Sequence, residues 1–83
     1  MEQVTIFGRA SCGFCTRARQ LCEINELLYR YVDIEMEGIS KANLSETIGK
    51  PVHTVPQIFV GQQHIGGFDD FSELLGRAGT MKN

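Results

Sequence analysis

The 83-residue sequence has no basic excess, no long apolar run and only two histidines. Lys and Arg number 8 against 10 Asp and Glu, for a net charge of -2, whereas nucleic-acid-binding domains carry a basic excess. No apolar run approaches the roughly 18 residues that indicate a membrane-spanning helix. Residues 1–3 lack the basic start and the apolar core of a signal peptide. We therefore expect a cytoplasmic protein with neither nucleic-acid nor membrane partners.

Length and cysteine content narrow the possibilities further. The chain is short enough for one domain over residues 1–83, with no linker, repeat or low-complexity segment. Three cysteines in a reducing compartment indicate catalytic or metal-binding thiols rather than a disulfide framework. His53 and His64 are too few and too irregularly spaced to complete a zinc site with Cys12 and Cys15, so we expect no zinc.

The motif Cys12-Gly13-Phe14-Cys15 follows a short apolar run at residues 4–7 and opens a helical pattern. Unpaired N–H groups and the positive end of the helix dipole favour a thiolate at a helix N-terminus. Cys12 is therefore the candidate nucleophile, and Cys15 is the second thiol that can release it in two-electron exchange. Half of a zinc site or two buried structural cysteines is the alternative, but a strand followed by CxxC and a helix favours redox chemistry.

The hydrophobic period changes along the chain and predicts seven elements. We expect strands at residues 4–7, 29–34, 57–60 and 63–65, and helices at 13–28, at 41–48 and from Asp69 or Asp70 onward. The strands at 4–7 and 29–34 are joined through a helix and are expected to be parallel. The order β-α-β-α-β-β-α predicts an α/β fold with a four-stranded mixed sheet and three helices.

Local signals set the expected ends of these elements. Ser40 is a plausible N-cap of the second helix, which Gly49 ends. Asp70 and Glu73 have the spacing of a capping box at the last helix. On the first helix, an apolar face is predicted from residues spaced by three and four: Ala18, Leu21, Cys22, Asn25 and Leu28.

Four segments resemble the glutaredoxins, and the resemblance covers nearly the whole chain. A lone CxxC is weak evidence, but together with a Thr-Val-Pro roughly forty residues later and a Gly-Gly before the last helix it is specific. The chain is most similar to the bacterial dithiol type, which implies a thioredoxin fold and a glutathione-dependent thiol–disulfide oxidoreductase. The segments are Phe7-Gly8-Arg9, Tyr31-Val32-Asp33-Ile34, Thr54-Val55-Pro56-Gln57-Ile58-Phe59-Val60 and His64-Ile65-Gly66-Gly67-Phe68.

The Thr54-Val55-Pro56 segment fits peptide binding. Proline donates no hydrogen bond and belongs at the start of a strand. The resemblance implies that Pro56 is cis and faces the CxxC, which would free the Val55 N–H and C=O to pair with an extended peptide, here glutathione. An ordinary trans proline at a strand edge is the alternative.

The Gly66-Gly67 pair precedes a helix N-terminus, whose free N–H groups suit an anion such as the γ-glutamyl carboxylate of glutathione. Asp69 or Asp70 could take the α-amino group. Such a pair is by itself a common turn. The resemblance carries γ-glutamyl binding onto Phe68, Asp69 and Asp70, and we expect Gly67 beside them to be part of the glutathione site.

Three further side chains have expected roles. Arg9 could stabilise the thiolate and pair with a glutathione carboxylate, or be a solvated surface arginine. Phe14, commonly Tyr in the family, keeps an apolar ring beside the glutathione site. Cys22 lies roughly 10 Å along the helix from Cys15, at 1.5 Å per residue, which is beyond disulfide reach, so we expect it in the core.

Gly13 departs from the dithiol pattern, which usually has proline there. Glycine at this position is similar to the monothiol glutaredoxins, and non-proline dithiol motifs are associated with a [2Fe–2S] cluster between two protomers. Cys12 of each subunit and one glutathione per subunit would then supply four sulfurs. The alternative function is thus a cluster carrier or sensor, whereas without a cluster we expect a monomer.

Reduction of protein disulfides and of protein–glutathione mixed disulfides is the main expectation, with glutathione as reductant. The resemblance implies ribonucleotide reductase as one partner. A thioredoxin-like reductase that ignores glutathione fits poorly with residues 66–70.

Overall fold

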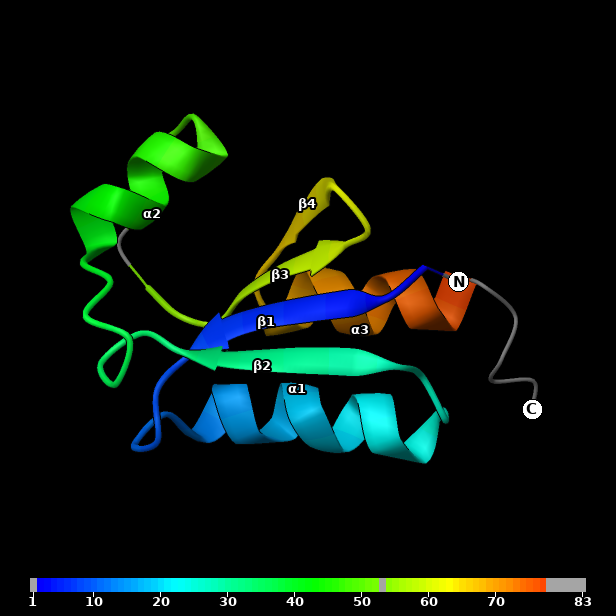
Figure 1. Cartoon of the computed structure of the whole chain (residues 1–83). Helices are drawn as coiled ribbons and strands as arrows, with labels where there is room; N and C mark the ends of the chain where they lie inside the picture. The colour runs from blue at the N-terminus through cyan, green and yellow to red at the C-terminus, as the bar shows by residue number, and fades with distance from the viewer. Residues whose placement is uncertain (1, 53, 78–83) are drawn as a thin grey trace.

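The computed structural model describes residues 2–52 and 54–77, which form four strands and three helices (Figure 1). The sheet order is β2-β1-β3-β4; β1 and β2 are parallel, and β3 runs antiparallel to both β1 and β4. The predicted mixed sheet and element order are confirmed. The elements are β1 (Val4–Gly8), α1 (Gly13–Ile24), β2 (Tyr29–Asp33), α2 (Lys41–Ile48), β3 (Gln57–Val60), β4 (Gln63–Gly66) and α3 (Phe68–Arg77).

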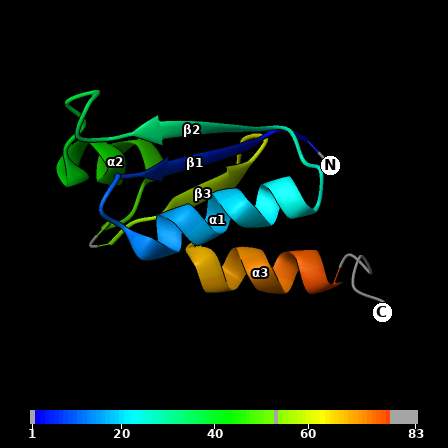
Figure 2. The ribbon, with the colours of Figure 1, turned by 90° about the horizontal axis from the view of Figure 1, so that it is seen from below.

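The main core lies between the sheet and two helices. Figures 1 and 2 show α1 and α3 side by side against one face of the sheet, with β1 in its centre. Burial alternates along β1, as the two-residue period of a strand requires, so its buried side chains point at the helices. The fully or nearly fully buried members of this core are Val4, Ile6, Ala18, Cys22, Ile58, Phe71 and Leu75.

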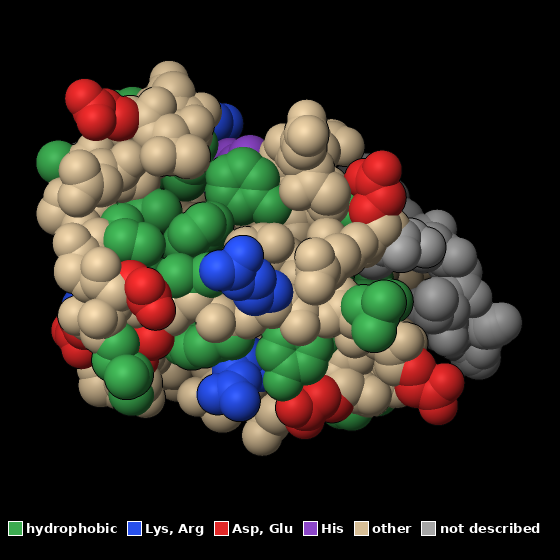
Figure 3. Space-filling view, viewed as in Figure 1, with side chains coloured by type: hydrophobic (Ala, Val, Ile, Leu, Met, Phe, Trp, Pro, Cys, Tyr) green, Lys and Arg blue, Asp and Glu red, His purple; other side chains and the backbone are tan. Residues whose placement is uncertain are grey.

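A second, smaller core anchors α2 beyond the end of β1. Figure 3 shows hydrophobic side chains gathered between α2 and the strands. Ile34, Leu44 and Val52 form this cluster, and Val55 packs against it. The cluster therefore connects α2 to the Thr-Val-Pro segment.

Local cap signals predicted α2 correctly. Ser40 Oγ accepts from the Asn43 N–H at 3.0 Å, and Asn43 Oδ1 accepts from the Ser40 N–H at 3.1 Å. Gly49 ends the helix at φ 89°, a left-handed conformation that glycine adopts without a steric penalty.

The predicted extent of the first helix is wrong, because α1 ends at Ile24 rather than near Leu28. The Asn25 side chain donates to the Leu21 carbonyl at 2.8 Å, and Glu26 takes a positive φ of 56°, so the chain turns here. Leu28 is 80% exposed and does not belong to the buried face.

The capping box expected from Asp70 and Glu73 is also wrong. Helix α3 begins at Phe68, so Asp70 lies inside its first turn. Its Oδ2 accepts from the Gly67 N–H at 3.1 Å, satisfying a donor just before the helix. Smaller differences are that β1 continues to Gly8, β2 stops at Asp33 and β4 continues to Gly66.

We expect Ser40→Ala to lower the free energy of unfolding by about 1 kcal/mol, because it removes the acceptor for the Asn43 N–H. For a domain of this size that corresponds to roughly 4–8 °C in the thermal midpoint. Ser72→Ala, at an exposed position inside α3, is the control and should leave the midpoint nearly unchanged. Equal midpoints for the two variants would contradict the capping role.

Candidate active site

Cys12 occupies the N-cap of α1, as the sequence predicts. Its backbone is extended, with φ -95° and ψ 116°, and its Sγ accepts from the Cys15 N–H at 3.1 Å. The Cys12 N–H in turn donates to the Arg9 carbonyl at 3.2 Å. The loop after β1 thus places this sulfur against the free N–H groups of a helix start, which stabilise negative charge on it.

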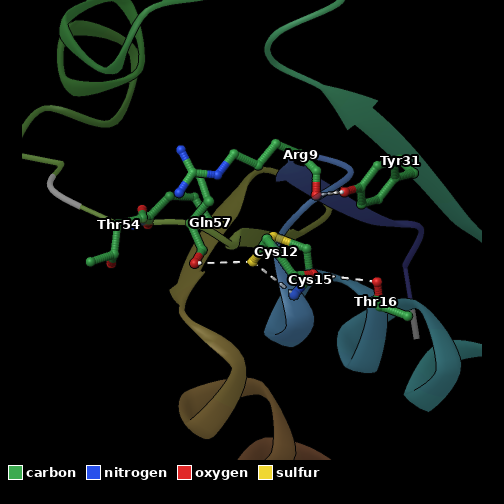
Figure 4. Close-up of a disulfide and its surroundings, with 8 residues drawn as sticks. Arg9, Cys12, Cys15, Thr16, Tyr31, Thr54 and Gln57 are labelled. Atoms are coloured by element: carbon green, nitrogen blue, oxygen red, sulfur yellow. Dashed lines mark hydrogen bonds between the residues drawn. A yellow bond between two sulfur atoms is a disulfide. The ribbon is translucent and has the colours of Figure 1, made fainter.

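Cys12 and Cys15 form a disulfide, with their Cα atoms 5.2 Å apart (Figure 4). The two sulfurs differ in access, because Cys12 is partly exposed whereas Cys15 is 0% exposed. An incoming thiol therefore reaches Cys12 and not Cys15.

The surroundings of Cys15 keep it protonated in the dithiol form. Burial raises the pKa of Cys15 to about 12, and a hydrogen bond with the Cys12 side chain adds to this rise. The Arg9 backbone and the Tyr31 hydroxyl act in the opposite direction. Since only a thiolate attacks a disulfide and Cys15 keeps its proton, the accessible Cys12 at the helix N-cap is the nucleophile that the geometry favours.

The Val55–Pro56 peptide is cis, as the resemblance implied. It lies beside the cysteine pair, with the Val55 carbonyl oxygen 3.6 Å from Cys12 Sγ, a hydrogen bond when Cys12 is a thiol. The Val55 main chain therefore borders the reacting sulfur.

A pocket of about 330 Å³ opens next to this main chain. The rings of Phe14 and Phe68, with centroids 5.7 Å apart, belong to its wall. Eight of the nine residues predicted to bind glutathione line it: Phe14, Thr54, Val55, Pro56, Gly67, Phe68, Asp69 and Asp70. The structure thus brings together segments that are far apart in the sequence.

Arg9, the ninth, does not line the pocket. Figure 4 shows its side chain pointing toward Thr54. Its Nε is buried and has no hydrogen-bond partner among the described residues, which is uncommon for a buried polar atom.

Two residues of the site, Gly8 and Tyr31, were not predicted to have a role. A Cβ on Gly8 would lie 2.6 Å from Cys15 Sγ and 2.8 Å from the Tyr31 hydroxyl oxygen. The Cys15 sulfur can therefore occupy its position only because Gly8 has no side chain. The position of Gly8 between the buried strand and Cys12 was the available signal.

Cys22 is buried in the main core and free, as predicted. Burial raises its pKa to about 11, so it stays an unreactive thiol.

Within residues 2–52 and 54–77, no group of three or more His, Cys, Asp or Glu side chains could hold a metal ion, and His53 lies outside the described residues. In the same part of the chain, no helix has the length and apolar character to cross a membrane. The [2Fe–2S] alternative stays a prediction. Cys15 and Cys22 are both buried, so of the three cysteines only Cys12 could reach a cluster from the surface.

Fold and site together define a thioredoxin-fold dithiol oxidoreductase. A sequence model described as glutaredoxin matches residues 4–65. A glutaredoxin of Vibrio cholerae is 56% identical over 73 residues, covering 82% of this chain and 84% of that protein. The chain belongs to the glutaredoxin family and is a thiol–disulfide oxidoreductase.

Solved structures agree with this assignment. Reduced Escherichia coli glutaredoxin superposes with a TM-score of 0.79 at 50% identity, covering 90% of this chain and 94% of that one. A buckwheat glutaredoxin–glutathione complex gives a TM-score of 0.76 at 28% identity, covering 90% and 69%. The predicted thioredoxin fold is confirmed.

We expect Gly8→Ala to destabilise the protein by about 1–3 kcal/mol, because the added methyl group overlaps the Cys15 sulfur. Thermal unfolding of the oxidised protein measures this. Gly13→Ala is the matched control, since no atom lies within 4 Å of a Cβ there. An equal loss of stability in the two variants would contradict the steric conflict expected at Gly8.

Proposed function

We propose that this oxidoreductase uses glutathione and reduces both protein–glutathione mixed disulfides and protein disulfides. The observation that carries the proposal is the pocket beside Cys12, which joins the Thr54–Pro56 segment to the start of α3. The structural similarity to a glutaredoxin crystallised with glutathione supports it.

An extended tripeptide suits the main chain at Val55. Strand β3 begins at Gln57, so Val55 precedes the hydrogen-bonded ladder, and its carbonyl already borders Cys12 Sγ. A bound peptide can therefore pair with Val55 as a short added strand, with its own sulfur next to Cys12.

The charges around the pocket suit the two ends of glutathione. The N-terminus of α3 offers free N–H groups to the γ-glutamyl carboxylate, and Asp69 or Asp70 suits the α-amino group. On the other side, the Arg9 side chain points toward Thr54 of the pocket wall, so its positive guanidinium suits the glycine carboxylate. Opposite charges at the two ends would fix the direction of the bound peptide.

Mixed disulfides with glutathione require Cys12 alone. The Cys12 thiolate attacks the glutathione sulfur, the bond between glutathione and the substrate protein breaks, and the protein leaves as a thiol after taking up a proton. A second glutathione thiolate then attacks the glutathione sulfur on Cys12, which restores the Cys12 thiolate and releases glutathione disulfide.

Protein disulfides require both cysteines. Cys12 attacks one substrate sulfur and forms a mixed disulfide; Cys15 then attacks Cys12 Sγ and expels the substrate as a dithiol. The resulting Cys12–Cys15 disulfide is the state in the structure, and two glutathiones reduce it. Potentials of about -200 to -230 mV, typical of glutaredoxins, are compatible with a cytoplasmic location and reduction by glutathione. Ribonucleotide reductase is the protein substrate that the family resemblance suggests.

Serine variants separate the two routes. We expect Cys12→Ser to abolish turnover of a glutathionylated peptide and of a peptide with an internal disulfide, because both reactions begin at this sulfur. Cys15→Ser should retain turnover of the glutathionylated peptide and lose that of the internal disulfide. Steady-state assays coupled to glutathione reductase measure both, and loss of both activities in Cys15→Ser would contradict the division of roles.

Arg9→Gln tests glutathione recognition. Loss of a charge-assisted hydrogen bond should raise the KM for a glutathionylated peptide roughly tenfold. A mixed disulfide with γ-glutamylcysteine, which lacks the glycine carboxylate, should give the same KM with wild type and variant. Arg30→Gln, at an exposed position on β2, is the charge-matched control. An equal rise for both substrates would assign Arg9 a role other than carboxylate binding.

A further inference from the structure

The Tyr31 hydroxyl lies close to the buried sulfur of Cys15, next to Gly8. The Cβ position of Gly8 is 2.8 Å from the hydroxyl oxygen and 2.6 Å from Cys15 Sγ, so the two atoms lie close to the same point. A side chain at Gly8 would clash with both. These atoms come from neighbouring elements, since β2 carries Tyr31 and pairs with β1, while α1 carries Cys15.

The Tyr31 side chain is held at its hydroxyl and at its ring. It donates to the Arg9 carbonyl at 3.1 Å, and the Arg19 guanidinium lies 4.7 Å from the centroid of the tyrosine ring. Burial raises the pKa of Tyr31 to about 12, and the charge of Cys15 adds to the rise. The hydroxyl therefore keeps its proton at neutral pH and can act as a donor.

Cys15 needs such a donor in one step of the dithiol route. When a thiol opens the Cys12–Cys15 disulfide by attack on Cys12, Cys15 leaves as a thiolate. A thiol of high pKa leaves slowly, and the pKa of Cys15 is about 12 because it is buried. The groups that stabilise its thiolate are the Arg9 backbone and the Tyr31 hydroxyl.

We propose that the Tyr31 hydroxyl donates a hydrogen bond to Cys15 Sγ while that sulfur carries negative charge, as the Cys12–Cys15 disulfide is broken or formed. This inference rests on the proposed dithiol route. In the opening direction, an external thiolate bonds to Cys12 Sγ, the Cys12–Cys15 bond breaks, and the electron pair stays on Cys15, which then takes a proton from water. In closure the Cys15 thiolate attacks Cys12 Sγ and expels the external thiolate. Tyr31 keeps its own proton throughout.

The hydrogen bond to Arg9 is the partner of this hydroxyl in the disulfide state. A disulfide sulfur is a weak acceptor, so the hydroxyl donates to the carbonyl instead. Rotation about the bond between ring and oxygen redirects the proton to Cys15 when charge develops there.

The test compares Tyr31→Phe with Tyr29→Phe in single-turnover experiments. Oxidised protein is mixed with 2-mercaptoethanol, quenched with acid and analysed by mass spectrometry for the mixed disulfide; closure is followed from the isolated mixed disulfide. Tyr29 is the matched control because it lies on the same strand and its hydroxyl donates to Glu23 Oε2 at 2.7 Å. This small thiol makes the result independent of the glutathione pocket.

We expect Tyr31→Phe to slow opening and closure by the same factor, roughly tenfold, and to leave their ratio unchanged. Tyr29→Phe should change neither rate. In a Cys15→Ser background, Tyr31→Phe should leave turnover of a glutathionylated peptide unaltered. Unchanged rates in Tyr31→Phe, or an equal loss in the Cys15→Ser background, would overturn the proposal, whereas failure of Cys15→Ser itself would count against the proposed function.

A second measurement does not depend on how well Tyr31→Phe folds. The chain has only two tyrosines, so fluorotyrosine incorporated into the Tyr29→Phe protein replaces Tyr31 alone. A more acidic phenol donates a stronger hydrogen bond to a thiolate, so opening and closure should both become faster. Slower or unchanged rates would overturn the proposal.

Discussion

The packing of Cys15 against Gly8 is the contact on which the rest of the site depends. Strand β1 is central in the sheet, and it ends in a residue without a side chain where the first turn of α1 crosses it. The helix can therefore approach the strand closely, bury Cys15 and leave Cys12 at its N-cap. Close-packed interiors tolerate no extra methyl group at such a point without rearrangement.

This arrangement makes two chemically identical residues different. Cys12 has access to solvent, a donor from the Cys15 N–H and the Val55 carbonyl as neighbour. Cys15, by contrast, is buried, and its pKa is raised. The order of events in thiol–disulfide exchange thus follows from position within one helical turn, since attack occurs where a thiolate and free access coincide.

Features that depend on residues close together in the sequence were predicted better than features that depend on contacts between distant segments. The caps of α2 are local, so Ser40 and Gly49 were recognised. The end of α1 depends on the Asn25 amide and on a positive φ at Glu26, which a periodic pattern does not contain. In α3, Asp70 lies inside the first turn and accepts a hydrogen bond from the Gly67 N–H. The sequence spacing had instead placed Asp70 at the N-cap of the helix. The pocket residues were found through motifs. The contact of Gly8 and Tyr31 with Cys15 joins three elements, so the motif segments that contain Gly8 and Tyr31 did not show it.

The second hydrophobic cluster gives α2 a connection to the pocket beside Cys12 that its own sequence does not suggest. Leu44 of α2 belongs to the cluster against which the Val55 side chain packs. The main-chain carbonyl of Val55 contacts Cys12 Sγ. A change in the volume of a side chain on α2 can therefore be transmitted to Val55 through a single layer of packed residues. Under the proposed function, substitutions on α2 can thus alter affinity for the tripeptide although α2 does not line the pocket.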